Sequence, residues 1–236
     1  MHKKDLIFHD PLKFIEHEIE DTLTAGGFGA VLARAGVGKT AFLIQLALSS
    51  LLRNKNVLHI SLNDPVKKVS LWYEEVFRNI ANEYTFERID QLFEGILSHR
   101  FIMTFKVEGF SVPRFEERLT DLIEQGIFSP QIILIDGLPF DETTKEILSD
   151  LKTIAKIHSA HIWFSVRTHH HEKPDHNSIP APLSRVADLF EVVIQLQPQE
   201  NDIHVKMIKS THTTSDFPSL ILDPSTMLIH IKKSEK

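Results

Sequence analysis

Cysteine is absent from all 236 residues of the chain. This absence excludes disulfide bonds and thiolate chemistry, because both need the cysteine sulfur. Proteins of reducing compartments typically lack disulfides, so we expect a cytoplasmic protein. The N-terminal residues also contain no long apolar segment of the kind found in signal peptides.

An excess of basic residues is missing as well. The chain has 26 Lys and Arg residues against 32 Asp and Glu residues, which gives a net charge of −6. We therefore expect no broad surface for DNA or anionic lipid, although a local basic patch is compatible with this charge. No run approaches the ~18 apolar residues of a membrane-spanning helix. Nucleic acid is a disfavoured partner, and no membrane association is expected.

What the chain does contain is a phosphate-binding loop. Residues 33–40 read ARAGVGKT, between an apolar run at 27–32 that predicts a strand and a run at 41–52 that predicts a helix. This strand–loop–helix order is the context in which the motif is meaningful. The first position of the pattern is usually Gly and here is Ala33.

The composition of the loop suits phosphate groups. Small residues let successive backbone N–H groups turn toward phosphate oxygens, and the following helix adds a partial positive charge at its N-terminus. Lys39 can reach the outer phosphates, and the Thr40 hydroxyl can bind Mg²⁺. We expect ATP to be bound by eight consecutive residues: Arg34, Ala35, Gly36, Val37, Gly38, Lys39, Thr40 and Ala41.

A carboxylate about a hundred residues later completes the candidate site. Residues 131–135 form a continuous apolar run, typical of a buried parallel strand, and this run ends in Asp136. Ligands of doubly wound sheets lie beyond the carboxyl ends of the strands. Asp136 is therefore a candidate Mg²⁺ ligand together with Thr40. The alternative is an aspartate at an ordinary strand-to-turn junction.

The order of the apolar segments predicts an α/β fold with a mostly parallel central sheet covered by helices and with antiparallel C-terminal strands. We expect residues 1–24 to form a lead-in with one helix at 11–23, and residues 25–236 to form one domain. Further strands are predicted at 57–61, 101–105, 162–166, 192–194, 204–208, 220–222 and 227–231, with a turn at 223–226. Further helices are predicted after Pro65 and at 86–97, 114–125 and 142–158.

The segment ARAGVGKTAFLIQLAL at residues 33–48 resembles the start of the RecA-like P-loop ATPases, among which the DnaB-type helicase cores and the KaiC group are most similar. The resemblance continues through 57–62 and 132–136, and more weakly through 162–166 and 206–211. It covers residues 25–236. It implies a P-loop NTPase fold, binding of ATP with Mg²⁺, and assembly into homo-oligomers such as rings.

Two positions depart from the pattern that the resemblance implies. These ATPases usually carry a Glu after the second strand that polarises the attacking water, and here Asn63 is followed by Asp64. Asn cannot take up a proton at neutral pH, and Asp64 is a shorter substitute. Alternatively, both residues only cap the helix that follows. On a later strand, Val166 stands where a polar residue that senses the γ-phosphate is common, and Arg167 could serve instead.

In many relatives a Lys and an Arg of one subunit reach the nucleotide of its neighbour, where positive charge stabilises the transferred phosphoryl group. Residues 206–211 contain Lys206 and Lys209 and no Arg. On a regular strand these two lysines point to opposite faces, so only one can serve, and we favour Lys209. The alternative is an ordinary solvent-exposed lysine.

Residues 168–183 are polar and rich in His and Pro, which predicts a loop. The cluster of His169, His170, His171 and His176 raises the question of a metal site, but adjacent histidines rarely converge on one ion and no Cys supports them. We expect a solvated loop. The alternative is a nucleotide-coupled loop that touches single-stranded DNA, for which the segment has few fixed cations and no aromatic residue.

Together these features predict a Mg-ATP-binding switch with slow hydrolysis, because Asn63 and Val166 replace the residues that the resemblance implies. One alternative is a regulatory or scaffolding module that does not hydrolyse ATP. Another is a DNA-dependent motor or recombination accessory ATPase. A small-molecule kinase would need an acceptor pocket or lid that the sequence does not show. GTP is disfavoured because the Asn-Lys-x-Asp segment of guanine-binding relatives is absent.

Overall fold

A computed structural model describes residues 26–83, 89–168, 179–200, 202–210 and 218–232, together with Ile7 and Leu12. The predicted lead-in helix at 11–23 lies outside the described residues except for Leu12, whose side chain is buried in the core. The histidines at 169–171 and 176 also lie outside them. The domain boundary near residue 24 and the histidine loop therefore stay predictions.

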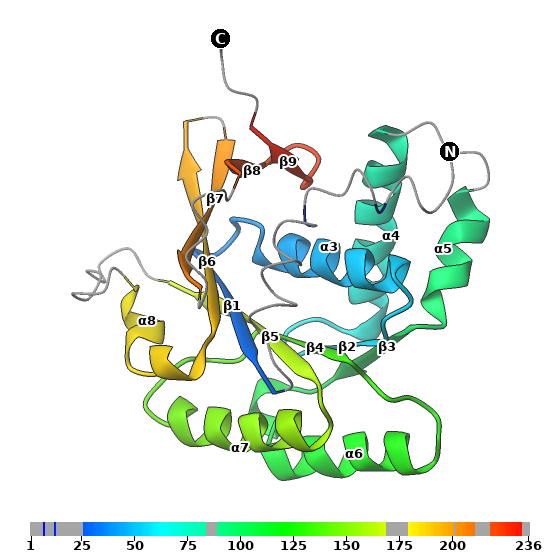
Figure 1. The fold of residues 1–236 in the computed structure, drawn as a ribbon, viewed down its shortest axis with the longest axis vertical. Coiled ribbons are helices and arrows are strands. Elements are labelled where there is room, and N and C mark those ends of the chain that lie inside the picture. The colour runs from blue at the N-terminus through cyan, green and yellow to red at the C-terminus, as the bar shows by residue number, and fades with distance from the viewer. Residues whose placement is uncertain are drawn as a thin grey trace.

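One sheet runs through the described part of the chain, with nine strands in the order β3-β2-β4-β5-β1-β6-β7-β8-β9. Strands β3 to β6 in this order pair in parallel. Strands β6 to β9 pair antiparallel and extend the sheet at one side (Figure 1). The strands are β1 (Phe28–Ala33), β2 (Val57–Ser61), β3 (Arg100–Thr104), β4 (Ile132–Asp136), β5 (His161–Arg167), β6 (Val192–Gln199), β7 (Asp202–Lys209), β8 (Leu220–Leu222) and β9 (Ile229–Ile231).

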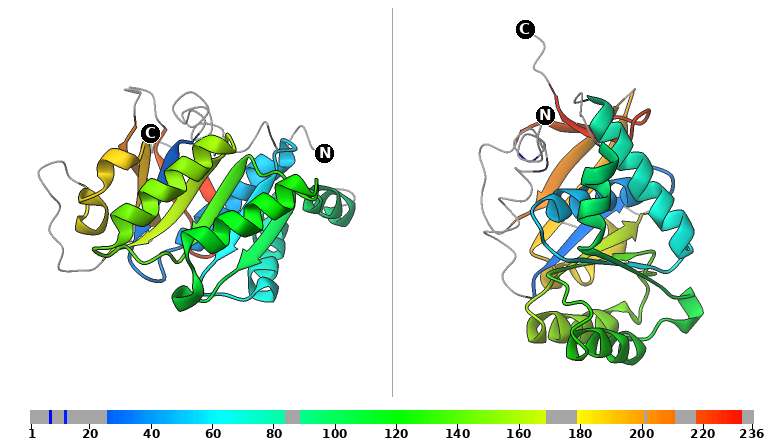
Figure 2. Two further views of the ribbon diagram at one scale, coloured as in Figure 1. Left: turned by 90° about the horizontal axis from the view of Figure 1, so that it is seen from below. Right: turned by 90° about the vertical axis from the view of Figure 1, so that its right-hand side faces the viewer.

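Helices cover both faces of the sheet, as Figures 1 and 2 show. Helices α3, α4 and α5 share one hydrophobic core with one face of the sheet. Helices α6, α7 and α8 share a second core with the opposite face. The helices are α3 (Lys39–Leu52), α4 (Val66–Glu83), α5 (Ile89–Leu97), α6 (Val112–Glu124), α7 (Thr144–Ile157) and α8 (Ala181–Ser184), with short 3₁₀ turns η1 (Val107–Gly109) and η2 (Ala187–Leu189).

The burial of these elements follows from their sequences. Every residue of β1 is buried, as is expected for a continuous apolar run in the middle of a helix-covered sheet. Helix α3 is buried from Ala41 to Leu52 because it lies between the sheet and α4 (Figure 1), which explains why apolar residues occur almost all round it.

The predicted fold class is confirmed, including the parallel core and the antiparallel C-terminal strands. Three details differ from the prediction. Strands β6 and β7 each have eight residues and are longer than expected. Helix α6 begins at Val112, two residues early, with Pro113 in its first turn. The predicted loop at 168–183 contains the short helix α8, which is anchored by the fully buried Leu183.

The register of the parallel strands brings the candidate site together. Ser61, the last residue of β2, pairs with Asp136, the last residue of β4. Ala33, the last residue of β1, pairs with Arg167, the last residue of β5. The carboxyl ends of these strands therefore meet at the same edge of the sheet as the phosphate-binding loop.

Candidate functional site

The phosphate-binding loop connects β1 to α3. Gly36 has a φ of 77° and Gly38 a φ of 103°, backbone conformations that residues with a Cβ rarely adopt. Gly38 directly precedes α3, and the first turn of this helix has neither an acidic residue nor a side-chain cap among the described residues. The N-terminal N–H groups of α3 are therefore available to an anion, which the helix dipole also attracts.

Lys39 lies across the loop. Its Nζ donates hydrogen bonds to Ala33 O at 3.1 Å and to Arg34 O at 2.9 Å. Burial lowers the pKa of Lys39, the negative charge of Asp136 opposes this shift, and the positive charge of Arg167 adds to it. The ammonium group is thus held between the loop, the carboxylate of β4 and the end of β5.

Thr40 and Asp136 are in direct contact, although 96 positions separate them in the sequence. Thr40 Oγ1 donates to Asp136 Oδ2 at 2.7 Å. The structure therefore brings the two candidate metal ligands together. Hydroxyl and carboxylate oxygens are the type of donor that Mg²⁺ prefers, so the residues at this position fit the ion.

Ser165 is a further member of this cluster and was not singled out in the sequence. Its hydroxyl donates to Asp136 Oδ1 and accepts from the Gly137 backbone N–H at 3.0 Å. Both carboxylate oxygens of Asp136 thus have hydroxyl donors. The signal in the sequence is a single hydroxyl residue within the apolar strand IWFSV, where a polar side chain needs a partner.

Asn63 and Asp64 follow β2 at the same edge of the sheet. Asn63 is exposed, and its side chain covers Gly137 so closely that a Cβ added to this glycine would collide with Asn63 Nδ2. Asn63 therefore stands beside the residue that follows Asp136. Asp64 accepts a hydrogen bond from Lys68 Nζ at 2.8 Å, and its own N–H donates to Ser61 Oγ at 3.0 Å. The side chain that bonds backbone here is thus that of Ser61, not of Asp64.

Val166 and Arg167 occupy different environments at the end of β5. Val166 is fully buried in the core that β5 shares with α6, α7 and α8. Arg167 is exposed at the strand end, and its charge acts on Lys39. The structure therefore places Arg167, and not Val166, beside the phosphate-binding loop.

The expectation that Lys206 and Lys209 point to opposite faces of β7 is wrong. The pairing of β6 with β7 skips Ile208, so that Lys209 faces Val193 while Lys206 faces Gln195. Val193 and Gln195 are two residues apart and share one face of β6, so the bulge brings both lysines to the same face. Lys209 Nζ donates to Ala187 O at 2.6 Å, and Lys206 is exposed. The role of Lys209 at a neighbouring nucleotide stays a prediction, and it requires release of this bond.

Comparison with known proteins supports the fold. No protein-family model matches the sequence, and no curated protein matches it. Among solved structures, the ATPase domain of a DnaB-like helicase is similar, with a TM-score of 0.65 over 92% of this chain and 89% of that chain, at 16% sequence identity. Among the described helices, none combines the length and apolar character needed to cross a membrane. The chain has the fold of the RecA-like P-loop ATPases.

Proposed function

We propose that the protein binds Mg-ATP at the loop formed by residues 34–41 and acts as a nucleotide-dependent switch with slow hydrolysis. The observation that carries this proposal is the 2.7 Å hydrogen bond between Thr40 and Asp136. It joins the phosphate-binding loop to the carboxylate at the end of β4, which is the pair of oxygen donors that a nucleotide-bound Mg²⁺ requires.

Each residue of the site has a defined task in this proposal. The loop N–H groups and the α3 N-terminus bind the phosphate oxygens, and Lys39 exchanges its bonds to Ala33 O and Arg34 O for phosphate contacts. Thr40 and Asp136 hold Mg²⁺, directly or through water. The ion neutralises charge on the phosphate groups. Arg167 adds positive charge at the same edge of the sheet.

Slow hydrolysis is proposed because the described residues near Asp136 supply a poor general base. Asn63 lies beside Gly137 but cannot accept a proton at neutral pH. Asp64 has a carboxylate, but this carboxylate is paired with Lys68. A base must lie within hydrogen-bond reach of the attacking water, and Asp64 would have to leave its lysine partner to do so.

Titration calorimetry with ATP and MgCl₂ tests the binding. We expect the wild-type protein to bind, and Lys39→Ala to abolish binding because it removes the cation that the loop surrounds. Lys145→Ala, which changes an exposed lysine on α7, is the matched control and should bind like the wild type. Equal affinity of Lys39→Ala and the control would refute the site assignment.

Phosphate release measured on the same samples distinguishes a second candidate function. The fold similarity to a domain described as an ATPase favours an enzyme with useful turnover. Turnover of several ATP per second would support that candidate and contradict slow hydrolysis. Mass in solution with and without ATP tests the proposed homo-oligomer, and stimulation of hydrolysis by single-stranded DNA would favour a DNA-dependent motor.

A further inference from the structure

The turn between β8 and β9, residues 223–228, lies against the phosphate-binding loop; we name it the C-terminal turn. A Cβ built on Gly38 would lie 2.7 Å from Leu222 Cδ2 and 3.7 Å from Met227 Sδ. The Gly38 backbone therefore packs directly on Leu222, at the end of β8, and close to Met227 in the turn. The loop cannot move toward this hairpin unless Leu222 moves as well.

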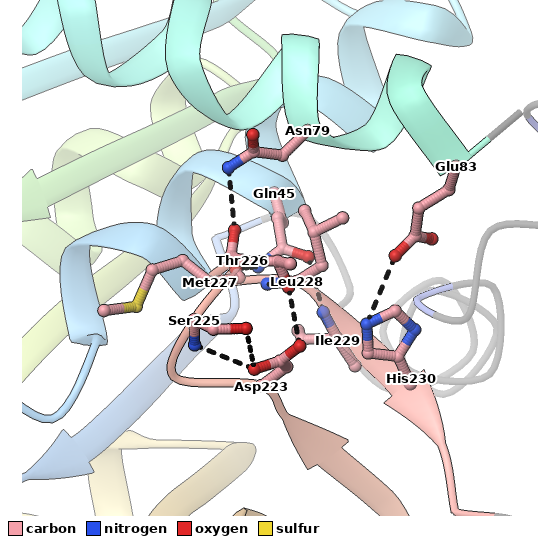
Figure 3. A network of polar contacts seen from close by, with 10 residues as sticks. All are labelled: Gln45, Asn79, Glu83, Asp223, Ser225, Thr226, Met227, Leu228, Ile229 and His230. Atoms are coloured by element: carbon pink, nitrogen blue, oxygen red, sulfur yellow. Dashed lines mark hydrogen bonds and ion pairs between the residues drawn. The ribbon is translucent and has the colours of Figure 1, made fainter.

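The same turn is bonded to α3, the helix that begins at the loop. Gln45 is 5% exposed; its Nε2 donates to Met227 O at 2.7 Å, and its Oε1 accepts from Ile229 N–H at 2.9 Å (Figure 3). Both ends of a buried amide are thus used to fix the hairpin against α3. Such a fully satisfied buried group specifies one arrangement of its neighbours.

Helix α4 contacts the turn from its other side. Asn79 Nδ2 donates to Thr226 O at 2.9 Å, and Glu83 Oε1 lies 3.4 Å from His230 Nε2 (Figure 3). Helix α4 follows directly after Asn63 and Asp64 at the opposite end of the site. The C-terminal turn therefore connects the two helices that begin at the candidate nucleotide site.

The conformation of the turn depends on such contacts. Strands β8 and β9 have three residues each, which is too short a ladder to fix a hairpin by itself. The Asp223 carboxylate accepts hydrogen bonds from Ser225 N–H, Ser225 Oγ and Thr226 Oγ1. Met227 has a φ of 58°, which a residue with a side chain adopts only when its surroundings impose it.

We propose that the C-terminal turn positions the phosphate-binding loop for nucleotide, and that Asn79 acts through this turn as a positioning residue. The inference rests on the proposed function, because the coupled site is the Mg-ATP site. Coupling between two equilibria is reciprocal. A turn that favours the binding-competent loop is therefore itself held more firmly when nucleotide is bound.

The first test is the affinity of Asn79→Ala for ATP in the presence of MgCl₂, measured by titration calorimetry on the full chain. Asn79 is on α4 and bonds the turn, so we expect binding weakened by a few-fold to about tenfold, the size of coupling through an intermediate element. Asn82→Ala, an exposed asparagine on the same helix, is the matched control and should bind like the wild type. Unchanged affinity of Asn79→Ala overturns the proposal.

The second test is hydrogen exchange of the Ile229 amide in the wild-type protein, which needs no variant to fold. Saturating ATP with MgCl₂ should slow this exchange several-fold, and exchange that stays the same overturns the proposal even if ATP binds. Failure of the wild type to bind ATP in the calorimeter is a different result. It refutes the proposed function, and with it the inference.

Discussion

Ser165 decides how the carboxylate of Asp136 is presented. The serine is 4% exposed, donates to Asp136 Oδ1 and accepts the Gly137 N–H. Removing its hydroxyl frees one oxygen of the carboxylate and leaves a partly buried N–H without its acceptor. The second effect costs about 1–3 kcal/mol of stability. The first acts on the metal site, so the two can be separated by experiment.

We predict that Ser165→Ala raises the Mg²⁺ concentration needed for half-maximal ATP binding, because Asp136 loses the partner that orients it. The change should be of the order of tenfold, the lower end for loss of a group that orients a metal ligand. A Mg²⁺ titration of ATP binding measures it. Ser149→Ala, on the exposed face of α7, should leave the Mg²⁺ dependence unchanged. Identical curves for Ser165→Ala and wild type would show that Asp136 is oriented without the serine.

His59 is a fully buried titratable residue on β2. Its Nδ1 lies 3.0 Å from Tyr73 OH, and the Arg100 guanidinium stacks 4.6 Å from the centre of the same tyrosine ring. Burial lowers the pKa of His59 to about 4; Asp136 opposes this shift, and Arg100 adds to it. The imidazole is therefore neutral in the folded protein at neutral pH.

This lowered pKa makes stability depend on pH. The unfolded chain takes up the proton near pH 6.5, whereas the folded protein takes it up only near pH 4. Stability is complete above about pH 6.5 and falls as the pH drops toward 4, by about 3 kcal/mol in all. We predict that His59→Asn, which keeps an acceptor for Tyr73, flattens this slope in urea unfolding experiments. His158→Asn, directly after α7 and only half-buried, should keep the slope of the wild type.

At the scale of elements, the sequence predicted what is determined by burial. Strands β1 and β4 are continuous apolar runs because they are covered on both faces, and α3 is apolar all round because the sheet and α4 enclose it. The phosphate-binding loop and Asp136 could be found because the residues before and after them identify their elements. Their contact then follows from the parallel register.

What the sequence did not predict depends on pairing partners. A shift of one residue moves a side chain to the other face of a sheet, so the orientation of Ser165 toward Asp136 needed the pairing of β5 with β4. The bulge at Ile208 reversed the expected face of Lys209 for the same reason. The packing of the C-terminal turn on Gly38 joins residues almost 190 positions apart, and no local pattern encodes it.

At the scale of the whole molecule, the candidate site belongs to the same cooperative structure as the core. Helix α3 begins at the phosphate-binding loop and contributes most of its length to the core on its side of the sheet. The sheet also carries the second core on its other face. A ligand that binds the folded loop alone therefore stabilises the entire domain, because the loop cannot unfold by itself without exposing α3.

We therefore predict that saturating ATP with MgCl₂ raises the thermal unfolding midpoint of the wild-type protein. Ligand at a hundred times its dissociation constant adds about 2.7 kcal/mol, which corresponds to about 5–10 °C for a domain of this size. Circular dichroism and the fluorescence of Trp163, buried on β5, should report the same midpoint. Lys39→Ala should unfold at the same temperature with and without ATP. An equal rise in that variant would place the ATP elsewhere in the molecule, and separate midpoints for the two probes would show that the site and the core unfold independently.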